Sequence, residues 1–264
     1  MAERLPIDLP KSLAAERHGE IGVLRLARPE KRNALDDETV LAIERFFGAL
    51  PDGIKAVVVH GEGEHFCAGL DLGEIEERDV TEGIAHSQLW HRAFREIEFG
   101  KVPVVAVLHG AVVGGGLELA AACHVRVAER SAFYALPEGS RGIFVGGGGS
   151  VRLPRLIGVA RMADMMLTGR SYDAEEGLAI GLTQYLVEPG QGMAKGLELA
   201  GLIAGNAPLT NFAVMQALPR IADADPAGGY AMEALMSAIA QADGEAKARL
   251  KAFLEKRAPK VARK

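Results

Sequence analysis

The sequence has few cysteines and no long hydrophobic run. Cys67 and Cys123 are the only cysteines in 264 residues, and two cysteines cannot build a disulfide framework. Both lie in apolar surroundings, where we expect them to pack as small buried thiols. The longest apolar run is far shorter than the ~20 residues of a membrane span, and the first residues lack the apolar core of a signal peptide. We therefore expect a cytoplasmic protein that does not enter a membrane.

Basic charge and metal-ligand spacing are also lacking. The net charge is -5, and no basic stripe recurs along the chain, which argues against nucleic acid as a partner. The histidines are scattered and none has metal-ligand spacing, so no metal site is expected. His65, His109 and His124 are more often structural than catalytic in such settings. No G-x-S-x-G nucleophile elbow is present. A local basic cluster at Arg28, Lys31 and Arg32 is compatible with one small anionic ligand.

The pattern of predicted elements indicates an α/β core followed by helices. Hydrophobic and charged contents of 48% and 25% are ordinary for a globular protein, and the length suffices for a substantial core. Residues 1–19 read as a loose lead-in. Predicted strands at 21–27, 56–60 and 104–108 alternate with helices up to about residue 188, and only helices follow residue 190. This order favours an α/β core with a helical C-terminal appendage.

Capping residues predict where several helices begin. Asp36 or Asp37 is expected to cap a helix that runs to about Leu50. Residues 81–99 form a second helix, with Ile84, Leu89, Phe94 and Ile97 among its expected inward positions. Ser171 or Asp173 is expected to cap a later helix that Gly181 ends, before a strand at 183–188. Asp71 is a candidate cap for a short helix.

Three consecutive glycines, Gly114 to Gly116, follow the apolar strand at 104–108 and precede a helix that begins LELAAA. Backbone N–H groups at a helix N-terminus are left without intrahelical partners. A phosphate-binding loop fits poorly, because a Walker motif needs Gly-Lys-Ser/Thr here and a dinucleotide fingerprint needs a different spacing. Tight packing of the glycines is the plain alternative.

Two glutamates lie close to glycine-rich helix starts. Glu118 stands three residues after Gly115 in a helix that is apolar nearly all round, so both can face one cavity. A solvated glutamate favoured by the helix dipole is the alternative. Glu138 follows Pro137 in a turn and could be an ordinary turn residue. Free amides with two carboxylates nearby suit chemistry that forms an enolate and moves protons.

Taken together, five segments resemble those of the crotonase superfamily, the enoyl-CoA hydratase/isomerase proteins. Each segment alone is weak, but the five occur in the right order over nearly the whole chain. They are the Arg-Asn-Ala-Leu turn at 32–35, the FCAGLDL stretch at 66–72, the GGGLELA stretch within 103–123, Pro137-Glu138 with the glycine run at 146–149, and AFLEKR at 252–257.

The resemblance implies a ClpP/crotonase-type spiral core of ββα units over residues 1–200. It further implies a helical trimerisation region at 201–264 and a homotrimer or a hexamer built as a dimer of trimers. The implied ligand is an acyl-CoA thioester, in which coenzyme A belongs to the substrate, and no separate cofactor is expected.

Particular residues match the family's functional positions. The amides of Leu70 and Gly115 match its oxyanion hole, and Glu118 and Glu138 match its two hydratase glutamates. The positions implied for coenzyme A are Arg28, Lys31, Ala34, Ala68 and Asp71, with Phe253 and Lys256 contributed by a neighbouring subunit.

The resemblance implies reversible syn addition of water to a 2-enoyl-CoA. Glu118 would deprotonate the water and Glu138 would protonate C2. An isomerase, another crotonase-type reaction and a non-catalytic CoA-binding module stay open, whereas a Clp-type peptidase lacks its nucleophile elbow and positioned histidine. The chain departs from the family pattern at Gly139 to Arg141, where aliphatic residues are common, at Val145 and at His124. Arg141 could pair with Glu138 or point to solvent.

Overall fold

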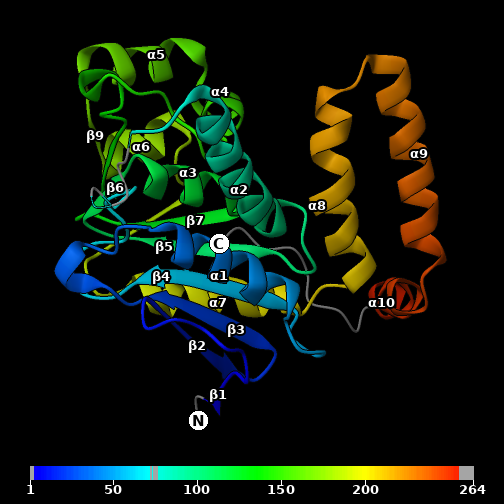
Figure 1. The fold of residues 1–264 in the computed structure, drawn as a ribbon. Helices are drawn as coiled ribbons and strands as arrows, with labels where there is room; N and C mark the ends of the chain where they lie inside the picture. Colours follow the sequence, from blue (N-terminus) through cyan, green and yellow to red (C-terminus); the bar gives the residue numbers. More distant parts are fainter. Residues whose placement is uncertain (1–2, 72, 74–76, 256–264) are drawn as a thin grey trace. The chain divides into compact units, whose positions relative to one another are not determined.

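The computed structural model describes residues 3–71, 73 and 77–255. The chain divides into two compact units, Met1–Ile203 and Ala204–Lys264. The first unit mixes strands and helices, and the second is helical (Figure 1).

The main sheet of the first unit has seven strands, in the order β1-β2-β3-β4-β5-β7-β10. In this sheet β1, β2 and β3 are antiparallel neighbours, and β3, β4, β5, β7 and β10 run parallel. A smaller sheet has the order β6-β8-β9. The strand bounds are β1 Glu3–Arg4, β2 Leu13–His18, β3 Ile21–Leu26, β4 Ala56–Gly61, β5 Val104–Leu108, β6 Ala111–Val113, β7 Val125–Glu129, β8 Phe133–Ala135, β9 Tyr172–Asp173 and β10 Tyr185–Val187.

Helices connect these strands, as parallel neighbours require. The predicted α/β class is therefore confirmed. The bounds in the first unit are η1 Pro29–Lys31, α1 Asp37–Gly48, α2 Val80–Glu98, α3 Gly115–Ala122, η3 Gly139–Arg141, α4 Gly149–Ile157, α5 Val159–Thr168, α6 Ala174–Ile180 and α7 Gly192–Ala204.

The central strands are buried on both faces. Val57 and Val59 of β4 belong to the main core, together with Phe46 of α1 and Phe94 of α2. The intervening Val58 points to the other face, because side chains alternate along a strand. There α7 packs closely: a Cβ at Gly196 would lie 2.5 Å from a Val107 methyl carbon and 3.4 Å from one of Val58. A parallel sheet covered on both faces gives its strands their continuous apolar character.

Helices α1 and α6 each begin at a residue that was among their predicted caps. The Asp36 side chain accepts a hydrogen bond from the Thr39 amide (2.8 Å) and caps α1. Asp173 forms a capping box with Glu176 at the start of α6, and Gly181 ends that helix in the left-handed conformation. The strand expected at 183–188 is the shorter β10, Tyr185–Val187.

Two expectations from the sequence are wrong. Residues 1–19 are not a loose lead-in, because β2 pairs with β3 over its whole length, from Leu13 opposite Leu26 to His18 opposite Ile21. The half-exposed face of β2 carries polar residues, which weakened its strand signal. Ile84 does not point inward: it is 55% exposed, whereas Phe94 and Ile97 are buried. The first turns of α2 extend beyond the core that its last turns cover.

The second unit contains α8 Pro208–Asp223, α9 Pro226–Ala242 and α10 Gly244–Leu254. Helices α8 and α9 are antiparallel and lie side by side (Figure 1). The short helix expected after Asp71 lies mostly outside the described residues. Among the helices that the structure describes, none combines the length and hydropathy needed to cross a bilayer.

Candidate active site

The glycine triplet places a helix N-terminus beside a second loop. Gly114 has φ 52° and ψ -122°, a backbone conformation that favours glycine, and it lets α3 begin at Gly115. The Gly114 amide donates to the Ala135 carbonyl (2.9 Å), whereas the Gly115 N–H lies at the open first position of the helix.

Leu70 presents its amide from that second loop. The neighbouring residues pair with Leu35, whose N–H donates to the Gly69 carbonyl while the Asp71 N–H donates to the Leu35 carbonyl, each at 2.8 Å. This pairing turns the Leu70 N–H to the other side, where a Cβ built on Gly115 would lie 3.5 Å from it. Within the described residues, neither the Leu70 nor the Gly115 N–H donates a hydrogen bond. Two free donors therefore stand near each other.

Glu118 is buried one turn into α3, with 3% of its surface exposed. Its Oε1 accepts hydrogen bonds from the amides of Gly147 (2.8 Å) and Gly149 (2.7 Å). Burial raises the pKa of Glu118 from 4.5 to about 7; the Gly149 amide opposes the rise and the charge of Glu138 adds to it. Both amides bind Oε1, which leaves Oε2 available to another partner. The alternative of a solvated helix glutamate does not hold.

Glu138 is also buried, with 7% of its surface exposed. Burial raises its pKa, and the charge of Arg141 partly opposes this effect. Its Oε2 is fully buried and has no hydrogen-bond partner among the described residues. Since a buried polar atom without a partner is costly, this oxygen is a natural contact for a water or a ligand. A Cβ at Gly114 would lie 2.7 Å from Oε1, so a side chain there would displace the carboxylate.

A cavity of about 360 Å³ joins these groups. Both glutamates line it, as do Leu70 and Gly115. Trp90 of α2 forms part of the wall, and a Cβ at Gly115 would lie 2.8 Å from its ring. Two carboxylates and two free N–H groups therefore face one partly apolar space.

A second hollow, of about 310 Å³, adjoins this cavity. Ala68, Leu70 and Arg141 line both spaces, and Lys31, Ala34 and Asp71 line the second alone. A ligand can extend from one space into the other past Ala68 and Leu70.

Comparisons with known proteins agree with this architecture. The family model "Enoyl-CoA hydratase/isomerase" matches residues 16–264. The chain is 34% identical to the short-chain-enoyl-CoA hydratase of Clostridium acetobutylicum, covering 92% of this chain and 94% of that one. It is 32% identical to the 2,3-dehydroadipyl-CoA hydratase of Escherichia coli, covering 94% and 97%. The crystal structure of a "putative enoyl-CoA hydratase" from Rhodopseudomonas palustris CGA009 is 60% identical, with a TM-score of 0.92 over 95% of this chain and 97% of that one.

The chain belongs to the enoyl-CoA hydratase/isomerase family. The crotonase-type fold expected from the sequence is thereby confirmed, and the protein is an enzyme of this family.

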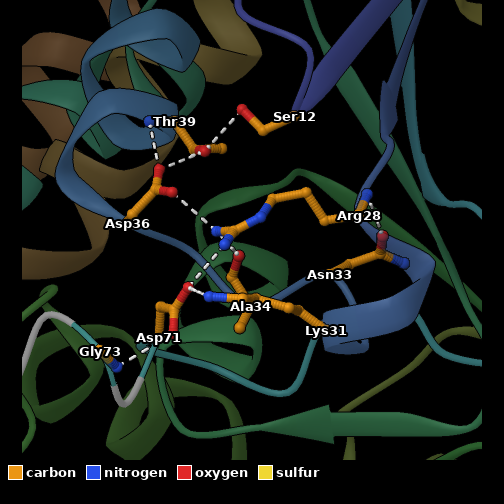
Figure 2. Close-up of polar contacts among 9 residues, drawn as sticks. All are labelled: Ser12, Arg28, Lys31, Asn33, Ala34, Asp36, Thr39, Asp71 and Gly73. Carbon is orange, nitrogen blue, oxygen red and sulfur yellow. Dashed lines mark hydrogen bonds and ion pairs between the residues drawn. The ribbon is translucent and has the colours of Figure 1, made fainter.

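Within this family member, the residues expected at the coenzyme A side form a charged network (Figure 2). The Arg28 guanidinium donates to Asp36 (2.7 Å), Asp71 (2.6 Å) and the Ala34 carbonyl (3.1 Å). Lys31 Nζ also donates to Asp71 Oδ2 (2.8 Å). Hydrogen bonds from Lys31 and the Gly73 amide lower the pKa of Asp71 to about 2, with Arg28 adding to the effect. Asp71 therefore stays charged and holds both cations at the turn, while the half-exposed Lys31 reaches the second hollow.

The remaining residues singled out in the sequence are Arg141, which lines both spaces, and two C-terminal positions. Arg141 ends η3, is exposed and has no ion-pair partner among the described residues. Phe253 is exposed on α10 in the second unit, and Lys256 lies outside the described residues. In the part of the chain that the structure describes, no cluster of side chains suits a metal ion.

The histidines singled out in the sequence have structural contacts. His124 accepts from the Val104 amide through Nδ1 (3.0 Å), which assigns the proton to Nε2, 3.2 Å from the Glu98 carbonyl. Burial lowers its pKa to about 4, so it stays neutral near pH 7. His65 Nδ1 lies 3.1 Å from the Ala111 amide, and His109 Nε2 lies 3.1 Å from the Gly63 carbonyl.

Four residues contribute to the site in ways that were not expected from the sequence. The amides of Gly147 and Gly149 hold Glu118, although the glycine run was expected only to start a helix. Trp90 lines the cavity, and as the only tryptophan in the chain it was a signal that could have been used. Arg152 donates to the Gly147 carbonyl (3.0 Å), and no sequence pattern pointed to this contact.

Proposed function

We propose that this protein is an enoyl-CoA hydratase that adds water reversibly, with syn geometry, to a 2-enoyl-CoA thioester. The observation that carries the proposal is the cavity in which two buried carboxylates face two unpaired backbone amides. The family membership and the names of the relatives support the same reaction.

The amides of Leu70 and Gly115 would bind the thioester oxygen. Negative charge accumulates on this oxygen when a nucleophile attacks C3, and donors already fixed by the backbone need no reorganisation to stabilise it. Each such donor contributes on the order of 10²–10³ in rate. A side-chain substitution at Leu70 keeps the amide, so its effect should be steric.

Glu118 and Glu138 would divide the proton transfers. Glu118 Oε2 accepts a proton from water as the water oxygen bonds to C3, while the amides of Gly147 and Gly149 keep Oε1 in place. Protonated Glu138 then gives its proton to C2, and the electron pair of the enolate forms the new C–H bond. The sum of both steps is one added water. The raised pKa of both glutamates suits this exchange, because acid–base catalysts work best with a pKa near the working pH.

Coenzyme A would lie along the second hollow. Lys31 is a half-exposed cation there and can meet phosphate groups. Arg28 and Asp71 fix the turn that carries it, and Ala34 and Ala68 line the passage. Phe253 and Lys256 of a neighbouring subunit stay candidates for the same ligand.

The test is hydration of crotonyl-CoA by the purified protein. The absorbance of the enoyl thioester should fall, and the product should gain the mass of one water, whereas isomerisation leaves the mass unchanged. Glu118→Gln and Glu138→Gln should each lower kcat/KM by about 10²–10⁴ without loss of CoA binding. Glu44→Gln, on α1 and outside the cavity, is the matched control and should keep full activity. Full activity in either site variant, or CoA binding without any turnover, would overturn the assignment.

A further inference from the structure

One wall of the cavity carries polar side chains, although a plain hydrocarbon chain would need only apolar walls such as that of Ile143, Phe144 and Val145. Ala68, Leu70 and Arg141 line both the cavity and the adjoining hollow, so they mark the coenzyme A side. Residues that line the cavity alone and belong to α2 or its approach mark the acyl side. They are Arg78, Gly83, His86, Ser87 and Trp90.

Helical spacing brings this wall together. Gly83, His86, Ser87 and Trp90 lie at positions i, i+3, i+4 and i+7 of α2 and therefore share one face. Nothing would come within 4 Å of a Cβ at Gly83, so the wall leaves space for an acyl group there. Three side chains that can hydrogen-bond an oxygen, those of Arg78, His86 and Ser87, line the same cavity.

Asp37, which does not line the cavity, holds the His86 ring in place. Its Nε2 lies 2.9 Å from Asp37 Oδ1, and the same oxygen accepts from Trp90 Nε1 (3.3 Å). Asp37 does not line the cavity, so His86 and Trp90 stand between its charge and the acyl space. The second ring nitrogen of His86 is not used by another described residue.

Arg78 supplies the positive charge on this wall. It is partly buried just before α2, and no described residue forms an ion pair or hydrogen bond with its guanidinium. The two acidic residues of the cavity, Glu118 and Glu138, come from other elements, where Cβ atoms built on Gly147 and Gly114 would lie 3.1 Å from Glu118 Oε2 and 2.7 Å from Glu138 Oε1. A guanidinium without a partner among the described residues, with a hydroxyl and an imidazole on the same cavity wall, is suited to a carboxylate.

We propose that the preferred substrate is an enoyl-CoA whose acyl group ends in a carboxylate, which Arg78 binds with help from Ser87 and His86. This inference rests on the proposed hydratase function and specifies the substrate class of the same site.

The experiment compares two thioesters whose acyl chains have equal length. The chain of 2-hexenoyl-CoA ends in a methyl group, and that of 2,3-dehydroadipyl-CoA ends in a carboxylate. For the wild type, kcat/KM should be at least about tenfold higher for the carboxylate, since hydrogen bonds to charged groups change equilibria by roughly ten- to hundredfold. Arg78→Met should lower the ratio of the two values by about tenfold, and Arg78→Lys should restore part of it. Arg92→Met, on the exposed side of α2, is the matched control and should leave the ratio unchanged.

The outcomes separate the two proposals. Hydration of hexenoyl-CoA with no preference for the carboxylate, or a ratio unaffected by Arg78→Met, overturns the substrate inference alone. Failure to hydrate either thioester or crotonyl-CoA overturns the hydratase proposal itself.

Discussion

At the scale of single residues, the fold works against the charge of Glu118. Burial raises its pKa from 4.5 to about 7, so the folded chain binds this proton more tightly than the unfolded chain does. Well below pH 4.5 Glu118 is protonated in both the folded and the unfolded state, so its burial carries no cost of a buried charge. As the pH rises towards 7, the unfolded state loses its proton first, and the free energy of unfolding falls by about 3 kcal/mol. The site thus gives up stability to keep a base with a high proton affinity.

Glu118→Gln should remove this pH dependence. Glutamine keeps an oxygen for the amides of Gly147 and Gly149 but does not titrate in this range. Between about pH 5 and pH 8, wild type should lose roughly 2–3 kcal/mol more stability than the variant. Urea unfolding at each pH and at one protein concentration measures the difference. Parallel curves for the two proteins would contradict the raised pKa.

Glu118 also shows how much of a site can be predicted from a sequence. Glu118 could be expected inside because the helix around it is apolar nearly all round. Its partners could not be predicted, because the amides of Gly147 and Gly149 come from residues 29 and 31 positions away along the chain. Contacts over such separations depend on packing that periodicity does not reveal.

At the scale of elements, α4 fixes the glycine run to α2. Arg152 of α4 donates through Nε to Glu98 Oε2 (2.7 Å) at the end of α2 and through its guanidinium to the Gly147 carbonyl (3.0 Å). Its side chain is largely buried. The peptide group that it holds, between Gly147 and Gly148, lies between the two peptide groups whose amides bind Glu118.

Arg152→Met should therefore impair turnover more than binding. With the run no longer held, the amides of Gly147 and Gly149 lose their alignment on Glu118, and kcat should fall by about ten- to hundredfold while KM changes less. Arg152→Lys should recover part of the loss, and Arg155→Met, on the same helix but outside the cavity, should behave as wild type. Steady-state kinetics with crotonyl-CoA, on variants of normal circular dichroism, test this. A rise in KM at unchanged kcat would assign Arg152 to binding instead.

Helix starts could be predicted from the sequence better than short strands, for a physical reason. Caps such as Asp36 and Asp173 act within one turn, so local sequence reduced each helix start to two candidates, of which the structure shows one. The strand β2 gains its stability from pairing with β3, and the strands β6, β8 and β9 are at most three residues long. Such short or half-exposed strands depend on distant partners, which the local pattern does not contain.

At the largest scale, that of assembly, the second unit exposes several large apolar side chains. Phe212 and Leu218 of α8, and Tyr230 and Leu235 of α9, are each more than half exposed. Large exposed apolar side chains are typical of interaction sites where they form a patch, and the resemblance to crotonases gives a second copy of the chain as the partner. The oligomeric state stays a prediction, namely a homotrimer or a hexamer built as a dimer of trimers.

Size-exclusion chromatography with light scattering should therefore find three or six copies of the 28.0 kDa chain. Leu235→Lys places a charge on the exposed face of α9, and burying an unpaired charge in an interface is costly, so the population should shift to smaller species. Leu235→Met keeps an apolar side chain of similar volume and should assemble as wild type does. A monomeric wild type at micromolar concentration would overturn the oligomer prediction, and with it the contribution of Phe253 and Lys256 from a neighbouring subunit. The hydratase proposal would survive that result, because the groups that it requires, from Leu70 to Glu138, all belong to the first unit of one chain.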